Sequence, residues 1–136
     1  MTESSVPHED IPHNQQVIEA FRKEGDDHLI LLTTTGRKSG KQIVAPVTFM
    51  RDGERLIVAA SNHGYAAHPA WYLNLRANPN VIVECGRERF EATATVTAGH
   101  DRARLLEMAK TGLPFVAEYQ ANTSREIQLV ALERAY

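Results

Sequence analysis

The chain has 136 residues and only one cysteine, Cys85, so an intramolecular disulfide is excluded. No apolar run approaches the ~20 residues that a membrane-spanning helix needs, and the chain does not open on a charged-then-apolar leader. A basic excess is missing too, because 15 Lys and Arg stand against 17 Asp and Glu, for a net charge of −2. Generic nucleic-acid binders show such an excess. These absences favour a reduced, cytoplasmic protein without a nucleic-acid partner.

Signatures of metal and hydrolytic sites are also missing. His63 and His68 belong to no HExxH helix and have no cysteine pair nearby, so we expect no metal site. Cys85 carries no local signature of a nucleophile, and no Gly-x-Ser-x-Gly elbow occurs. Hydrolysis by a catalytic triad is therefore not expected.

The length fits a single domain over residues 1–136. Residues 1–12 are polar and without an apolar period, so we expect a flexible tail. Apolar residues recur at helical spacing over 13–24 and predict a short helix that Gly25 is suited to end. Residues 28–35, rich in Leu, Ile and Thr, are typical of a buried strand.

Two hairpins follow from turn residues between strand-like runs. Asp52-Gly53 joins the runs 42–50 and 55–61, because both residues tolerate the positive φ of a tight turn. Pro46 lies within the first run and cannot donate to a ladder, so we expect an edge or a bulge there.

The second hairpin turns at 85–87 between the runs 81–84 and 88–98. Its second arm alternates apolar and polar residues, the period of a half-buried strand. The inward residues of this arm are expected to be Phe90, Ala92, Ala94, Val96 and Ala98.

Helices are predicted over 69–77, which opens on proline, over 100–110, and in a short piece from Pro114. Residues 126–133 predict a last strand. The expected inward residues of the helix over 100–110 are Ala103, Leu106, Met108 and Ala109. Six strands with hairpin connections and a few short helices indicate a mainly β, α+β fold, whose antiparallel sheet can close into a barrel.

The loop 36–41 (GRKSGK) is the first candidate site. It is not a P-loop, because three rather than four residues separate its glycines and no Ser or Thr follows Lys41. It presents Arg37 and Lys38 beside the Ser39 hydroxyl, a set suited to clamp an anion. A solvated basic turn fits the same residues, and both interpretations stay open here.

The helix over 69–77 carries two large aromatic side chains and an amide, those of Trp71, Tyr72 and Asn74. In one interpretation the aromatics are core. In the other, an aromatic ring forms the wall of a site for a flat ligand and Asn74 supplies hydrogen bonds. The residues by themselves favour the core interpretation.

Together, these segments resemble the deazaflavin-dependent nitroreductase family, part of the flavin and deazaflavin oxidoreductase superfamily of split β-barrels. The resemblance is close over 29–83 and looser from Pro114 through Tyr119 and Gln120 to the last strand. The matching motifs are LLTTTGRKSG at 31–40, Pro46, the turn at 51–53, VAAS at 58–61 and PAWYLNLRANP at 69–79.

The resemblance implies a six-stranded, mostly antiparallel split β-barrel that binds coenzyme F420, a deazaflavin. It implies hydride transfer from the reduced cofactor to an organic acceptor such as a quinone, an enone or a nitro compound. In the family, the basic loop holds the phosphate and the acidic tail, while the next two strands and a helix start enclose the ring. Carried over, the cofactor-binding residues are Arg37, Lys38, Ser39, Ile43, Val44, Ala45, Pro46, Val47, Thr48, Ala59, Ala60, Ser61, Asn62, Ala70, Trp71, Tyr72, Leu73 and Asn74.

A proton donor near the acceptor is also expected, and Tyr72 or Tyr119 is the candidate catalytic residue. Relatives that reduce nitroimidazoles have a Pro-x-Tyr-x-x-Tyr-Gln pattern, in which Val116 here replaces the first tyrosine. We therefore expect nitroimidazoles to be poor substrates. The acidic start of the chain argues against a membrane association beyond a peripheral one.

Two alternatives remain at this point. The same barrel could bind flavin mononucleotide (FMN), as proteins resembling pyridoxamine phosphate oxidase do, usually as dimers with the flavin at the interface. Alternatively, the chain could be a non-catalytic carrier of a deazaflavin. The sequence leaves open whether the protein is a monomer or a homodimer.

Overall fold

The computed structural model describes residues 12–62 and 67–135 of the chain. The flexible tail was expected over residues 1–12, of which 1–11 lie outside the described residues and Pro12 begins helix α1. The elements in chain order are α1 (Pro12–Glu24), β1 (Leu29–Thr35), β2 (Gln42–Asp52), β3 (Arg55–Ala59), α2 (Ala70–Ala77), β4 (Asn80–Cys85), β5 (Glu88–Val96), α3 (Gly99–Gly112), α4 (Phe115–Ala121) and β6 (Leu129–Arg134).

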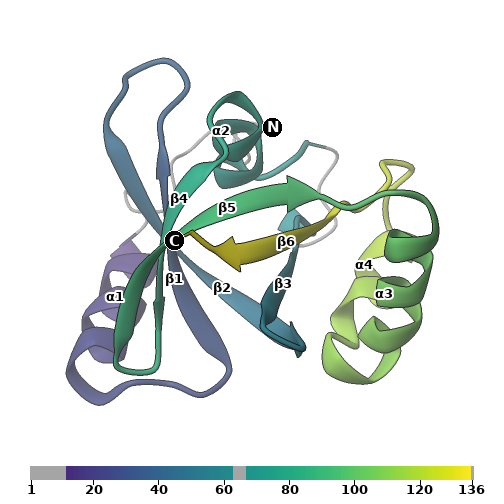
Figure 1. Ribbon diagram of the computed structural model, residues 1–136, viewed down its shortest axis with the longest axis horizontal. Helices are drawn as coiled ribbons and strands as arrows, with labels where there is room; N and C mark the ends of the chain where they lie inside the picture. Colours follow the sequence, from purple (N-terminus) through teal and green to yellow (C-terminus); the bar gives the residue numbers. More distant parts are fainter. Residues whose placement is uncertain (1–11, 63–66, 136) are drawn as a thin grey trace.

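The six strands form a closed barrel in the order β1-β2-β3-β6-β5-β4, and every pair is antiparallel. Tight turns make these pairings possible, with Gly53 and Gly86 both at positive φ between their strands. Figure 1 shows α1 beside one side of the barrel and α3 with α4 beside the other. The antiparallel barrel and the hairpin connections were predicted from the sequence, and the structure confirms them.

The barrel interior is filled by alternate residues of all six strands, as the period of two requires. Helix α2 contributes Trp71, Tyr72 and Leu75 to the same cluster, each at most 4% exposed. The side chains on this face of α2 therefore fill part of the barrel interior. Burying such aromatic side chains stabilises the fold by roughly 1.5–3 kcal/mol each.

A second apolar cluster lies outside the barrel, where α3 and α4 cover β3 and β6. Ile57 and Leu129 on the strands pack there against Leu105 of α3. Both faces of β3 and β6 are consequently buried, which gives these strands continuous apolar runs. On the other side, α1 places Ile18 and Phe21 against Leu31 of β1.

Strand β2 changes partner along its length. Its residues 42–48 pair with β1, whereas 49–52 pair with β3. One side of 42–48 therefore has no strand partner in the described structure, and Pro46 lies in the middle of this open edge. The expected edge at Pro46 is confirmed. We call the side of residues 42–48 that faces away from β1 the open edge of β2.

Two expectations about side-chain direction were wrong. In the second hairpin, Ala98 is exposed and Thr97 is buried instead, because β5 ends at Val96 and Thr97 bonds through both its N–H and its hydroxyl to the Leu129 carbonyl. In α3, Ala103 is exposed and Leu105 is fully buried. The buried face of α3 turns toward β3 and β6, and the amphipathic pattern of α3 alone did not reveal its direction.

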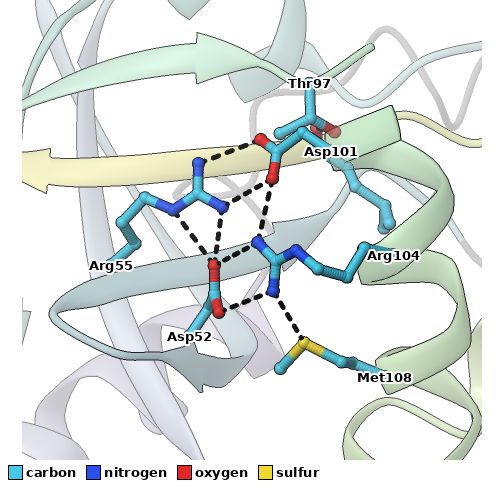
Figure 2. A network of polar contacts seen from close by, with 7 residues as sticks. Asp52, Arg55, Thr97, Asp101, Arg104 and Met108 are labelled. Carbon is cyan, nitrogen blue, oxygen red and sulfur yellow. Dashed lines mark hydrogen bonds and ion pairs between the residues drawn. The ribbon is translucent and has the colours of Figure 1, made fainter. Parts of the chain in front are cut away.

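A network of four charged side chains joins the β2–β3 turn to α3 (Figure 2). Arg55 donates to the carboxylates of Asp52 and Asp101 at 2.6–3.2 Å. Arg104 donates to the same two carboxylates at 2.8–2.9 Å. Each arginine thus bridges both carboxylates, a geometry that gives strong charge-assisted hydrogen bonds.

This network should make stability depend on pH. Hydrogen bonds from Arg104 and then Arg55 lower the pKa of Asp52, and the same arginines in the reverse order lower the pKa of Asp101. A carboxylate whose pKa is lowered by folding stabilises the protein above its unfolded value, roughly pH 4, and loses that contribution as the pH falls further.

We therefore expect the Asp52→Asn, Asp101→Asn double variant to unfold roughly 2–5 °C below wild type at pH 7, since the network is partly exposed. The difference should shrink as the pH falls below about 4 toward 2.5, because the wild-type carboxylates take up protons there in the unfolded state while the arginines hold them charged in the folded state. Thermal unfolding followed by circular dichroism measures both values. Glu107→Gln, which removes an exposed ion pair to Lys110, is the control and should leave the melting temperature unchanged. A difference that stays constant with pH would contradict the role of charge.

Candidate functional site

A cavity of about 250 Å³ lies where the open edge of β2 meets the end of β3, the start of α2 and helix α4. Most of its walls are apolar or aromatic, which is typical of sites for flat organic ligands. The lining residues are Pro46, Val47, Thr48, Ala59, Ser61, Asn62, Pro69, Trp71, Phe115 and Tyr119.

Eight of these ten lining residues were expected in the site from the sequence, and two, Pro69 and Phe115, were not. Pro69 precedes α2 and had been assigned only a role in starting that helix. Phe115 adjoins Val116, the position on which the sequence interpretation concentrated. The cavity therefore gathers four separate segments of the chain.

Other expected site residues do not line this cavity. Ala45 and Ala60 point into the barrel core, and Val44 packs toward α1. Ala60 has also used its backbone groups, since its N–H donates to the Gln128 carbonyl and its own carbonyl accepts from Arg125. Ile43, Ala70 and Leu73 are half-buried outside the lining.

Polar groups of the cavity remain available to a ligand. Thr48 and Ser61 make no side-chain hydrogen bond to any residue that the structure describes, although Ser61 is only 9% exposed. Along the open edge of β2, alternate backbone N–H and C=O groups point away from β1. A ligand with its own donors and acceptors can therefore bind the strand edge in place of another strand.

The basic loop lies at the start of β2 and is held in one tight conformation. Gly36 exchanges hydrogen bonds with Lys41 and Gly40, at 2.7 and 2.9 Å. Gly40 has a φ of +72°, which favours glycine, and a Cβ at position 36 would lie 2.6 Å from Ser39 Oγ, so a side chain there would displace Ser39. The Ser39 Oγ accepts from the Lys41 N–H at 3.1 Å.

The cations of this loop are exposed. Arg37, Lys38 and Lys41 form no ion pair with any carboxylate in the described part of the chain. Three cations within five residues therefore face solvent together, a local concentration of positive charge that attracts an anion. This favours the anion clamp over the solvated turn that the sequence also allowed.

Asn74 anchors the loop rather than lining the cavity. Its side chain is 2% exposed, and its Oδ1 accepts from the Arg37 N–H at 3.2 Å and from Arg37 Nη1 at 3.3 Å. Its Nδ2 donates to Thr34 Oγ1 at 3.2 Å. Asn74 was expected to supply hydrogen bonds to a ligand, but its amide is committed to holding the basic loop against α2.

The two tyrosines that were candidates for the proton donor lie in different places. Tyr119 is half-buried and lines the cavity, whereas Tyr72 is 3% exposed, lies in the barrel core and does not line it. The Tyr72 ring instead lies 4.5 Å from the ring of His68, centroid to centroid. Of the two, only Tyr119 is brought to the cavity.

Helix α4 turns Tyr119 to the cavity, but not the Val116 position of the family pattern. Phe115 and Tyr119 line it, with ring centroids 5.8 Å apart, while Val116 is 5% exposed in the cluster beneath α3. Residues four apart share a helix face as readily as residues three apart. A hydroxyl at position 116 would therefore point into the outer core and away from this cavity.

Arg125 is a residue of the site region that the sequence interpretation missed. Its guanidinium donates at 2.8 Å to the carbonyls of Ala60 and Ser61, and its Nη1 lies 3.2 Å from His68 Nδ1. Burial lowers the pKa of Arg125, with Tyr72 opposing that change. Burial, then Arg125 and Arg76, lower the pKa of His68, which favours the neutral imidazole. No motif marks this arginine in the sequence.

Two other kinds of feature are absent from the described residues. They contain no group of three or more His, Cys, Asp or Glu side chains placed to hold a metal ion. None of their helices is both long enough and apolar enough to cross a membrane.

Comparison with known proteins adds family information to this geometry. The family model of F420H(2)-dependent quinone reductases matches residues 10–134. An F420H(2)-dependent quinone reductase of Mycobacterium tuberculosis H37Rv is 38% identical over 108 residues, covering 77% of this chain and 72% of that protein.

Solved structures agree with this result. One described as an F420-H2-dependent reductase, FDR-A, superposes with a TM-score of 0.71 at 36% identity, covering 78% of this chain and 94% of the other. A second, described as a domain-swapped dimer, has a TM-score of 0.74 at 32% identity and covers 89% and 94% of the two chains.

Proposed function

This chain belongs to the F420H(2)-dependent quinone reductase family, and from that premise we propose that its cavity receives the deazaflavin ring and a quinone-type acceptor. The protein is an oxidoreductase that uses coenzyme F420 and has a split-barrel fold. Membership of this family supports two of the expectations. The cofactor is a deazaflavin rather than FMN, and the protein catalyses a reaction rather than only carrying the cofactor. Which residues perform each role is our proposal.

One observation carries the assignment of the site: the open edge of β2 connects the basic loop to the cavity. Residue 42 begins the strand after the loop, and residues 46–48 line the cavity, a distance of roughly 13 Å at about 3.3 Å per residue. The ligand must combine a flat ring with a phosphate and an acidic tail some distance away. Apolar walls at one end and exposed cations at the other fit those two parts.

The residues that hold the cofactor are proposed on this basis. Arg37, Lys38 and Ser39 bind the phosphate and the acidic tail, and the backbone of the open edge of β2 binds the polar edge of the ring. Thr48 and Ser61 offer further hydrogen bonds inside the cavity, while Trp71 forms an apolar wall. Asn74 acts indirectly, through the loop that it anchors.

When bound, reduced coenzyme F420 supplies a hydride, because carbon replaces the reactive nitrogen of a flavin and favours two-electron transfer. The protein contributes orientation and exclusion of water, through Pro46, Pro69 and Phe115 around the cavity. A quinone becomes a hydroquinone by gaining one hydride and one proton. Tyr119 is the hydroxyl on α4 at the cavity that we propose to deliver the proton to the quinone oxygen.

Binding and turnover test the proposal together. Trp71 is the only tryptophan of the chain and lines the cavity, so its intrinsic fluorescence should report cofactor binding directly. We expect coenzyme F420 to bind more tightly than FMN, and the reduced cofactor to be oxidised when a quinone is added. Trp71→Phe identifies the source of the signal.

Equal or tighter binding of FMN would reject the site assignment. Binding without oxidation by quinones, enones or nitro compounds would instead favour a carrier.

The oligomeric state is measured on the same sample by light scattering, and we propose a homodimer because one relative at 32% identity is described as a domain-swapped dimer. The cytoplasm stays the proposed location, supported by the single cysteine.

A further inference from the structure

Arg125 holds the backbone at the end of β3 in a turn. Its Nη1 and Nη2 donate to the carbonyls of Ala60 and Ser61, each at 2.8 Å. Successive carbonyls of an extended strand point in opposite directions, so a guanidinium that reaches both shows that the chain leaves strand geometry here. Asn62 follows with a φ of +45°, which completes the change of direction. Ser61 and Asn62 line the cavity, so this turn forms part of its wall.

The same guanidinium also reaches the segment that leads into α2. Its Nη1 lies 3.2 Å from Nδ1 of His68. A guanidinium only donates hydrogen bonds, so Nδ1 is the acceptor in this contact. His68 precedes Pro69, which caps α2 and lines the cavity, and the helix then presents Trp71. Arg125 therefore couples the wall after β3 to the wall at the start of α2.

The backbone of Arg125 is in turn fixed by α4. The side-chain amide of Gln120 donates to the Arg125 carbonyl at 2.7 Å and accepts from the Ile127 N–H at 2.9 Å. Gln120 follows Tyr119, the α4 residue that lines the cavity. Three cavity walls, after β3, before α2 and on α4, thus meet at this one residue, which does not itself line the cavity.

We propose that Arg125 is the positioning residue of this site and fixes the three walls relative to one another. The inference rests on the proposed function, because the walls in question are those that enclose the ring and the acceptor. Arg125 acts through the Ser61 turn, through His68 and through Gln120, and it touches neither reactant. Removal of the Arg125 side chain should misplace the three walls, although Tyr119 and the residues of the basic loop are still present.

The experiment compares Arg125→Ala with Arg102→Ala. Arg102 is a matched control, because its Nη2 donates to the carbonyl of Ile127 at 2.8 Å and so holds the same α4–β6 segment from α3, away from the cavity. Steady-state oxidation of reduced F420 by a benzoquinone, melting temperature, and amide hydrogen exchange of the free protein are measured for each variant.

For Arg125→Ala we expect kcat/KM to fall about 10–100-fold. The fall should come mainly from higher KM values for the two reactants, because a small misplacement of a binding wall weakens their binding. Free guanidinium ions should restore part of that loss. The amides of Ser61 and Asn62 should exchange faster than in wild type. Arg102→Ala should lower the melting temperature comparably while keeping KM and the exchange of those two amides. Arg125→Lys should be intermediate, because one ammonium group cannot hold both carbonyls and the imidazole in one plane.

Equal kinetics and equal exchange in Arg125→Ala and Arg102→Ala would overturn the inference. If Arg125→Ala does not fold, an unchanged KM and unchanged exchange in Arg125→Lys would overturn it instead. The exchange measurement needs no ligand, so it decides the inference even if the wild-type protein fails to oxidise reduced F420. A wild-type protein that does not oxidise reduced F420 would count against the proposed function. If the wild type is active but the two alanine variants cannot be distinguished, only the role of Arg125 is contradicted.

Discussion

Alanine in place of Arg37 or Lys38 is expected to weaken binding of coenzyme F420 by roughly 1–3 kcal/mol, the size of a charge-assisted contact, which is about 5–150-fold in the dissociation constant. The double variant should lose more than either single one. The loop conformation should survive, because it rests on backbone hydrogen bonds around Gly36 and on Ser39. The loss should be greatest for cofactor with a long glutamyl tail, and added salt should weaken wild-type binding.

The matched control is the double variant Arg87→Ala, Arg89→Ala. It removes the same net charge from two exposed residues of the β4–β5 hairpin, which make no ion pair with the described residues. Titration of Trp71 fluorescence gives all the dissociation constants. Unchanged affinity in the Arg37, Lys38 double variant would return the loop to the status of a solvated turn, and an equal loss in the control would assign the effect to net charge alone.

Replacing Tyr119 with phenylalanine is expected to lower turnover about 100-fold if its hydroxyl supplies the proton, while affinity for the cofactor stays nearly constant. The ring and its contact with Phe115 would be kept, so the variant removes only the oxygen. The assay is oxidation of reduced F420 with quinones, enones and nitroimidazoles as acceptors. We expect quinones and enones to be reduced and nitroimidazoles to react poorly.

Tyr72→Phe is the informative comparison, because sequence reasoning proposed both tyrosines and the structure brings only Tyr119 to the cavity. We expect Tyr72→Phe to retain most of the turnover. Full activity in Tyr119→Phe would remove this residue from the mechanism. An equally large loss in Tyr72→Phe would show that the proton reaches the acceptor by a route other than the cavity wall on α4.

The barrel was predictable because its determinants are local. Asp52-Gly53 and Gly86 specify tight turns, and alternating residues mark which face of each strand is buried. The open edge was predictable for the same reason. Proline has no backbone N–H to donate, so Pro46 by itself indicates that one side of its strand lacks a hydrogen-bonded neighbour. These signals do not depend on what packs against the strand.

The errors concern residues whose direction is set by distant partners. Leu105 is buried because α3 packs against the outer faces of β3 and β6, and the helix sequence does not record where those strands lie. Val116 and Phe115 changed roles for the same reason, as the cavity lies on one side of α4 and α3 on the other. Arg125 was missed because its partners are backbone carbonyls more than sixty residues away, which leave no mark in the sequence.

The open edge of β2 has a consequence for association of the free protein. Unpaired N–H and C=O groups on a strand edge can accept a strand from another chain, and this is a common start of aggregation. Proline fits an antiparallel ladder only where its nitrogen faces away from the paired strand, which at Pro46 is the open side. A strand arriving there would therefore find a missing donor midway along the edge. Pro46 thus keeps a surface that must stay accessible to a small ligand from becoming a template for self-assembly.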